Sequence, residues 1–313
     1  MRLPRVVPFL WLALVAPALA AAPEGRAVPG FEVTELAPGN FVHYGSLDAE
    51  RSPANMGDQA NIGFIVGEAC VAVVDPGGSL AVGQALRAAI RRVTDKPICY
   101  VIITHVHPDH FFGAAAFRED QAVVVGHENL PRAMSMRARP YLNGLKRDLG
   151  DLAAGSEVIA PTRLVTDEEV IDLGGRAIRL KAWPAAHTDN DLTVFDERTR
   201  TLWVADLLFI EHTPVVDGTI TGFIEVLDRL RTVDAKRYVA GHGKSDQPWP
   251  DVLEPERAYL ALIVRETRAA IKRRKTIEEA TDEVGLSEST RWVNFDTFHR
   301  RNVTTAYTEL EWE

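Results

Sequence analysis

The chain has 313 residues, of which 46% are apolar and 25% charged, with 22 glycines and 18 prolines. This composition is typical of a globular protein, and it excludes collagen-like, coiled-coil and low-complexity chains. The 35 Lys and Arg residues against 44 Asp and Glu residues give a net charge of −9, which disfavours a nucleic-acid-binding role. The one basic cluster, Lys272 to Lys275, is interpreted as a solvated helix end.

The first twenty residues have the pattern of a secretory signal peptide. Arg2 and Arg5 form a positively charged start, the apolar stretch from Val6 to Val15 follows, and Ala18-Leu19-Ala20 provides a small-residue cleavage site. Because no twin-arginine pair precedes the apolar stretch, export through the Sec system is favoured over Tat. We therefore expect an exported protein, periplasmic if the source is Gram-negative, and no membrane span in the mature chain.

The first half of the mature chain predicts strands that alternate with helices. A strand around residues 41–44 is followed by a polar loop over residues 45–60, of which Met56 is the expected apolar tip. Apolar β-branched runs and helical spacing then follow in turn. They predict strands at 61–66 and 70–74, a helix through 82–93, strands at 98–103 and 122–125, and helix and loop at 129–155. A strand, helix and strand in succession argue for a parallel βαβ unit.

The second half has its own set of strands, followed by a helical tail. It predicts strands at 169–172, 177–182, 192–195, 201–204 and 237–240, with a helix face at 223–230. We therefore expect an α/β (α+β) fold in which two sheets lie between helical layers. The expected organisation is a signal peptide (1–20), a catalytic domain (21–249) and a C-terminal helical extension (250–313).

Metal-binding side chains are concentrated directly after the predicted strand at 98–103. The segment from Thr104 to His110 reads THVHPDH and holds His105, His107, Asp109 and His110. His105 and His107 are two residues apart, so an extended backbone directs both to one side, and Pro108 is expected to enforce a turn. Imidazole and carboxylate ligands together suit Zn²⁺ or another borderline divalent ion.

Three further candidate ligands follow downstream, each at the end of an apolar run: His187, Asp206 and His242. Gly241 and Gly243 flank His242 and let the backbone pass close to a metal. The pattern His-x-His-x-Asp-His, then His, Asp and His, resembles that of the metallo-β-lactamase-fold hydrolases over about residues 40–245. The resemblance implies the αββα sandwich of that family. It also implies two Zn²⁺ ions, with iron or manganese as alternatives.

By this resemblance, His105, His107 and His187 hold the first ion. Asp109, His110 and His242 hold the second, and Asp206 bridges the two as in the glyoxalase II-like branch. A metal-bound hydroxide would attack the substrate carbonyl, with Asp109 as the catalytic residue that orients it and takes its proton. The implied substrate is a small molecule with an ester, thioester, lactone or related acyl bond.

Several other residues are candidates for supporting roles. Asp189 and Asp191 could each hold an imidazole N–H or be ordinary turn residues, and His212 could line the pocket. Three stretches further resemble the exported "quinoprotein relay system zinc metallohydrolase" group: Asn61 to Gly67, His187 to Asp191, and Phe295 to Glu311. This resemblance does not define a substrate, and the sequence leaves the oligomeric state open.

Other functions compete with the acyl-hydrolase prediction. An exported β-lactamase is compatible with most of the ligands, but Asp206 argues against it. An iron-dependent persulfide dioxygenase is disfavoured by export, and a nuclease by the acidic charge. A zinc-binding accessory protein without catalysis would keep the same ligands.

The two cysteines, Cys70 and Cys99, each lie five residues before a residue that ends a predicted parallel strand, namely Asp75 and Thr104. The equal spacing predicts neighbouring thiols at the start of adjacent strands, far from the metal ligands. Export permits a disulfide between them, but adjacent parallel strands rarely provide its geometry. Two buried thiols are therefore favoured over a bond.

Overall fold

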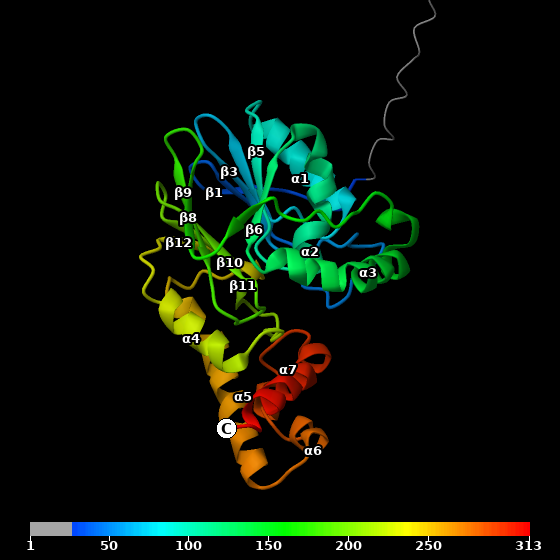
Figure 1. The fold of residues 1–313 in the computed structure, drawn as a ribbon, viewed down its shortest axis with the longest axis vertical. Helices are drawn as coiled ribbons and strands as arrows, with labels where there is room; N and C mark the ends of the chain where they lie inside the picture. The colour runs from blue at the N-terminus through cyan, green and yellow to red at the C-terminus, as the bar shows by residue number, and fades with distance from the viewer. Residues whose placement is uncertain (1–26) are drawn as a thin grey trace, which may run out of the picture.

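The computed structural model describes residues 27–313, so the predicted signal peptide lies outside the described residues. Two β-sheets lie face to face, and helices cover their outer sides (Figure 1). Within the described residues, the first sheet has seven strands in the order β1 to β7. The second has five in the order β12-β11-β10-β9-β8. The predicted αββα sandwich is confirmed.

The elements follow one another along the chain with few long connections. The strands of the first sheet are β1 (Thr34–Ala37), β2 (Asn40–His43), β3 (Ile62–Val66), β4 (Val71–Val74), β5 (Ile98–Ile102), β6 (Val123–His127) and β7 (Arg163–Val165). Those of the second are β8 (Glu168–Asp172), β9 (Ala177–Ala182), β10 (Leu192–Asp196), β11 (Thr201–Phe209) and β12 (Arg237–His242). The α-helices are α1 (Leu80–Val93), α2 (Pro108–Phe111), α3 (Leu130–Leu149), α4 (Ile220–Leu230), α5 (Glu254–Lys272), α6 (Ile277–Thr281) and α7 (Phe295–Leu310).

The predicted βαβ unit consists of β4, α1 and β5. Ser79 begins the helix, because its side chain accepts a hydrogen bond from the backbone N–H of Val82. Apolar residues at helical spacing face the sheet, and β4 and β5 pair in parallel. Parallel pairing brings the carboxyl ends of both strands to one edge of the sheet. Asp75 and the histidine-rich loop after β5 therefore meet at that edge.

Apolar side chains fill the space between the sheets and the space under each helical layer. Ile65, Val74, Ile102, Leu180 and Trp203 are fully or almost fully buried between the two sheets. A second cluster lies between the first sheet and α1 and α3, and a third between the second sheet and α4, α5 and α7. The sandwich is therefore packed on both sides of each sheet, which makes the edge that carries the metal-binding residues rigid.

The strand that carries Asp206 is longer than predicted. The apolar run indicates a strand that ends at Val204, whereas β11 continues to Phe209 and buries all nine of its residues. Asp206 is thus within the strand and not after it. Ala205 has a positive φ of 51°, and the pairing with β12 shifts register on both sides of it. This bulge lets Asp206 face the site while the strand continues.

The turn predicted at Pro108 is the four-residue helix α2, which Pro108 begins and where its missing N–H costs no hydrogen bond. Another local prediction is corrected by the structure. Met56 is not an exposed loop tip, since it is 2% exposed and packs in the cluster beneath the first sheet. An apolar side chain in a polar loop is more stable when it turns inward.

Cys70 and Cys99 are neighbours, as the strand register predicts, and both thiols are free. Burial, followed by the hydrogen-bonded thiol of Cys99, raises the pKa of Cys70 to about 12. A thiol with so high a pKa is a poor nucleophile near neutral pH. Cys70 is buried and Cys99 only partly buried, so the prediction of two buried thiols is confirmed for Cys70 and wrong for Cys99.

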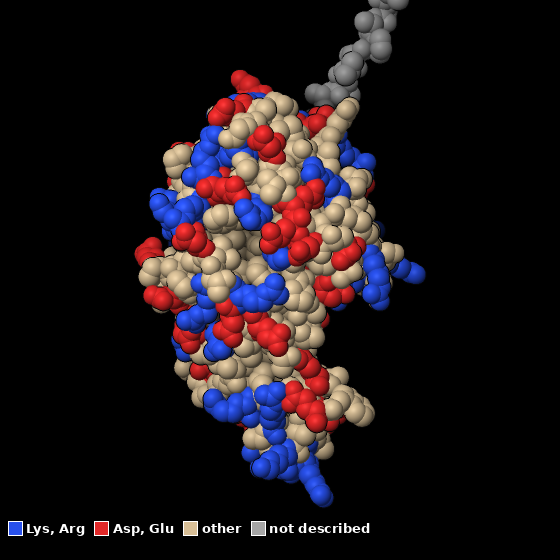
Figure 2. Space-filling model, turned by 60° about the vertical axis from the view of Figure 1, so that its left-hand side comes forward, with Lys and Arg blue, Asp and Glu red and all other residues tan. Residues whose placement is uncertain are grey.

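The C-terminal segment from α5 to α7 continues the second helical layer beyond the sandwich (Figure 1). Tyr259, Ile263 and Val303 belong to the same apolar cluster as residues of β11 and α4. No helix in the described part of the chain has the length and hydropathy needed to cross a bilayer. Acidic and basic side chains are interspersed over the face in Figure 2. Basic side chains gather at the lower end, where Figure 1 places the turn between α5 and α6.

Candidate metal centre

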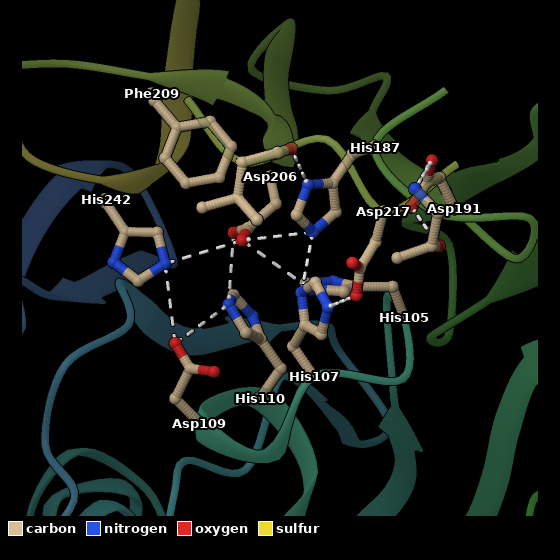
Figure 3. Close-up of polar contacts among 12 residues, drawn as sticks. His105, His107, Asp109, His110, His187, Asp191, Asp206, Phe209, Asp217 and His242 are labelled. Carbon is tan, nitrogen blue, oxygen red and sulfur yellow. Dashed lines mark hydrogen bonds and ion pairs between the residues drawn. The ribbon is translucent and has the colours of Figure 1, made fainter. Parts of the chain in front are cut away.

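The seven predicted ligands converge at one edge of the sandwich (Figure 3). The loop after β5 and the helix α2 provide four of them: His105, His107, Asp109 and His110. His187 comes from the connection between β9 and β10, Asp206 from within β11, and His242 from the end of β12. Both sheets therefore contribute, so the centre depends on how they pack together.

Their ligand atoms form two groups in which all atoms lie within 4.8 Å of one another. The first group is His105, His107, His187 and Asp206, and the second is Asp109, His110 and His242. Apart from Asp206, which the resemblance makes a bridge, the division is the one that the resemblance implies. Each group offers at least three nitrogen or oxygen donors, which is the number that a catalytic zinc site provides.

Asp206 lies between the two groups. Its Oδ2 is 3.4 Å from Nε2 of His187 and 3.6 Å from Nε2 of His105, both of the first group. The same carboxylate is 3.0 Å from Nε2 of His110 and 3.4 Å from Nε2 of His242, both of the second group. One carboxylate thus faces both groups, as a bridging ligand must.

Each histidine of the two groups uses its other ring nitrogen for a hydrogen bond away from the centre. The partners are Thr104 Oγ1 for His105 (3.0 Å), Asp217 Oδ2 for His107 (2.7 Å), Asp75 Oδ2 for His110 (2.8 Å), the Val215 carbonyl for His187 (2.7 Å) and the Gln59 carbonyl for His242 (3.1 Å). Such partners set the ring orientation and direct the other nitrogen inward, where it can bind a metal. The inward nitrogens of His107 and His187 lie 2.8 Å apart.

Asp75 and Asp217 hold the candidate ligands His110 and His107, and the sequence alone does not point to this role for either. Asp75 directly follows β4, the parallel neighbour of the strand before the histidine loop, and this placement is a signal that could have found it. Asp217 lies in an irregular loop 110 residues after His107. No local sequence pattern indicates that Asp217 contacts His107.

Three buried polar atoms at the centre make no well-directed hydrogen bond: Nε2 of His105, and Nε2 of His110 and Oδ1 of Asp206, which lie 3.0 Å apart as an ion pair. Buried polar atoms without partners are costly, and their presence calls for an explanation. All three face the point where the two groups meet (Figure 3). The residues therefore fit a bound metal, which would take these lone pairs as ligands.

Burial and neighbouring charges affect the two groups differently. Burial lowers the pKa of His107 to about 4 and that of His187 to about 3, so both are neutral and ready to bind a metal. Burial opposes charge on His110 as well. The carboxylates of Asp206, Asp109 and Asp75 outweigh it and hold the His110 pKa well above its usual value. The pKa of His242 is likewise raised, because Asp206 and Asp109 outweigh burial. A metal at the second group must displace protons from these rings.

Of the supporting residues predicted from the sequence, His212 lies at the centre, whereas Asp189 and Asp191 do not hold a ligand. Asp189 and Asp191 hold none of the five imidazoles, because Asp189 is exposed and Asp191 turns toward Thr188. The Asp191 carboxylate closes the turn after His187 by accepting from the backbone N–H and the hydroxyl of Thr188. His212 lies against His242, with ring centroids 5.2 Å apart, and lines the cavity in front of the centre. Burial, followed by the neighbouring His242, lowers the pKa of His212 to about 4.

Asp191→Asn is expected to make stability less dependent on pH. Burial raises the pKa of Asp191 to about 8, from 3.8 in an exposed chain. Its contribution to the free energy of unfolding is therefore complete below about pH 4 and is lost as pH rises toward 8. An asparagine accepts from the Thr188 N–H and donates to the Thr188 hydroxyl, as a protonated aspartate does. The thermal midpoint of the metal-free variant should exceed that of the parent by a few degrees at pH 8 and match it near pH 4.

The exposed Asp189→Asn is the matched control and should follow the parent at both pH values. Parallel pH profiles for Asp191→Asn and the parent would contradict an uncharged Asp191 in the fold.

A cavity of about 430 Å³ opens in front of the two groups. Asp48 to Arg51 and Gln59 of the loop after β2 line one part of it, and Arg147 of α3 lines another. Phe298 and Arg301 of α7 complete it from the C-terminal segment. The polar loop after β2 therefore forms part of the cavity wall, and the cavity is large enough for a small molecule.

The fold and the site together define an αββα protein with two groups of candidate metal ligands at one edge of its two sheets. The model of the metallo-beta-lactamase superfamily matches residues 55–242, which include all seven ligands. The chain belongs to this superfamily.

Two curated proteins illustrate the range of its relatives. A linear primary-alkylsulfatase of Pseudomonas sp. is 25% identical over 253 residues, which are 68% of this chain and 48% of that protein. A beta-lactamase-like protein 2 homolog of Caenorhabditis elegans is 25% identical over 189 residues, 60% of this chain and 56% of that one. The chain spans about half the length of the curated relatives that it matches.

Solved structures show the same fold at low sequence identity. A stereoselective inverting sec-alkylsulfatase from Pseudomonas sp. superposes with a TM-score of 0.68 at 16% identity and covers 90% of this chain and 50% of its own. A metallo-beta-lactamase from Pontibacter korlensis gives a TM-score of 0.58 at 16% identity and covers 74% of this chain and 99% of its own. The alkylsulfatase match therefore covers more of this chain than the lactamase match.

Proposed function

We propose that this chain is an exported hydrolase that holds two zinc ions and cleaves an ester, thioester, lactone or related acyl bond. The observation that carries the proposal is the meeting of two groups of buried ligand atoms around Asp206, directly below a cavity. Superfamily membership supports metal-dependent hydrolysis. Iron or manganese are the alternative ions, and the exported quinoprotein relay system group is the proposed subgroup.

Residues of this chain can take separate roles in such a reaction. A bound pair of divalent ions lowers the pKa of water toward ~7 and polarises the bond to be cleaved. Asp109 lines the cavity and lies 3.4 Å from Nε2 of His242. Its carboxylate is therefore placed to orient a water molecule and accept its proton. Phe209, Val215 and Phe298 form an apolar part of the cavity that can receive the substrate's hydrocarbon portion.

The substrate class follows from the charge at the centre. Asp206 adds a negative charge between the two groups and so lowers the net positive charge that two ions would create. A less positive centre attracts the carboxylate of a β-lactam less strongly. Neutral acyl substrates are therefore favoured over β-lactam antibiotics.

Sulfate esters are a second candidate class. Alkylsulfatases appear both as a sequence relative and as a solved structure, and the solved one also covers 90% of this chain. A non-catalytic zinc-binding accessory role remains the alternative outside the enzymes.

A substrate panel tests these assignments. The zinc-loaded protein should hydrolyse p-nitrophenyl acetate, a lactone or an acyl thioester measurably, and nitrocefin weakly or not at all. An alkyl sulfate belongs in the same panel. A kcat/KM for nitrocefin at least about tenfold above all others would establish the lactamase assignment instead. If only the alkyl sulfate were hydrolysed, sulfate esters would replace acyl compounds as the proposed substrate class. If no substrate were hydrolysed while two ions were bound, the accessory role would be favoured.

A further inference from the structure

One loop supplies the hydrogen-bond acceptors for two histidines of the first group. The carbonyl of Val215 accepts from Nδ1 of His187 at 2.7 Å, and Oδ2 of Asp217 accepts from Nε2 of His107 at 2.7 Å. The orientation of both rings therefore depends on where this loop, residues 213–219, is held.

The loop is attached on one side to the segment that carries His187. The backbone N–H groups of Asp217 and Gly218 both donate to the carbonyl of His187 at 2.8 Å. A Cβ at Gly218 would lie 2.5 Å from the carbonyl oxygen of Ala186, so only glycine permits this close approach.

On its other side, the loop is attached to helix α7. Asn302 is fully buried, accepts from the backbone N–H of Val216 at 3.0 Å and donates to the carbonyl of Pro214 at 2.6 Å. Glu309, two turns later, accepts from the N–H groups of Ile220 and Thr221 at the start of α4. Helix α7 therefore holds the loop by hydrogen bonds at Pro214 and Val216 and holds the start of α4 directly after it. The helix nevertheless lies outside the span that matches the superfamily model.

Arg301 of α7 acts directly on the carboxylate that holds His107. Its guanidinium pairs with Oδ1 of Asp217, while Oδ2 of the same carboxylate receives the His107 N–H. The Arg137 guanidinium lies farther away, 3.7 Å from Oδ2. With one oxygen taken by Arg301, the carboxylate presents the other to His107 in a single orientation. Figure 3 shows Asp217 beside His107 and His187.

We propose that Arg301 is a positioning residue for the metal centre, which it serves by orienting Asp217 and, through it, the ligand His107. The C-terminal helical segment then helps to hold a metal ligand in place. The proposal rests on metal binding at the proposed centre and does not depend on the identity of the substrate. Partners of this kind set ligand affinity, and their loss typically costs about 10- to 100-fold in metal affinity.

The chain offers a matched control for Arg301. Arg300, its neighbour on α7, is similarly exposed and pairs with Asp282, away from the centre. The glutamine substitutions R301Q and R300Q each remove one arginine charge from the same helix. A difference between them therefore isolates the contact with Asp217.

The affinities for the first and second zinc ions should be measured by competition with a chromogenic chelator, alongside the visible spectrum of the cobalt-loaded protein. We expect D217N to weaken one of the two ions about 10- to 100-fold and R301Q to weaken the same ion, by less. The double variant should match D217N alone, because Arg301 acts through Asp217. R301K should restore part of the affinity, and R300Q should leave both affinities unchanged.

Equal effects of R301Q and R300Q would overturn the proposal, as would full additivity of R301Q and D217N. Thermal midpoints of the metal-free variants show whether a loss of affinity reflects a loss of fold. A parent protein that binds no metal would overturn the proposal and the proposed function together. Two bound ions without turnover of any substrate would overturn only the proposed function.

Discussion

His107→Ala is expected to remove about one of two bound ions and to abolish hydrolysis. His107 is a ligand of the first group and is the histidine whose N–H Asp217 accepts. An ion at such a site contributes several kcal/mol of transition-state stabilisation, and about 1.4 kcal/mol corresponds to a factor of ten in rate. The loss in kcat/KM should therefore reach at least about a thousandfold. Metal analysis and a hydrolysis assay on the same preparation measure both effects.

His127→Gln is the control for this variant. His127 is also buried and ends β6, the strand beside β5, but it belongs to neither group of ligands. It should retain two ions and nearly full activity. A His107→Ala protein that keeps two ions, or a parent that binds no more than one in excess zinc, would show that the dinuclear assignment is wrong.

Asp206→Asn is expected to weaken the binding of both ions at once. The carboxylate lies 3.0 Å to 3.6 Å from nitrogens of four histidines that belong to both groups. Asparagine has nearly the same shape, so the packing of β11 should be preserved while the negative charge is lost. Removing a charge from so buried a position affects every ligand that faces it. We expect each zinc affinity to fall by about two orders of magnitude, in line with the upper end for residues that support a metal.

Asp109→Asn is the matched comparison, because its carboxylate contacts only histidines of the second group, His110 and His242. It should weaken one ion and leave the other. If Asp206→Asn also weakened only one ion, Asp206 would be a ligand of a single site and not a bridge. Isothermal titration of the metal-free variants with zinc distinguishes the two patterns.

The sequence by itself was sufficient to predict the layered fold and to name the seven candidate ligands that the fold brings together. His105, His107, Asp109 and His110 lie within six residues directly after a buried strand, so their proximity follows from local backbone geometry. The apolar periodicity of the strands and of α1 reports which side of each element is buried. The four clustered residues and the buried faces depend on residues close together in the chain, and the sequence therefore determined them. His187, Asp206 and His242 are distant in the chain, and the sequence pointed to them only through the family pattern.

Only the tertiary structure decided which groups hold the ligands in place. The contact of His110 with Asp75 joins residues 35 apart, and that of His107 with Asp217 joins residues 110 apart. Three further features likewise arise from packing: the bulge at Ala205 that turns Asp206 toward the site, the burial of Met56, and the hydrogen bonds between α7 and the loop at 213–219. Periodicity carries no information about which carboxylate or carbonyl meets a given imidazole, because that pairing depends on how distant segments dock against one another.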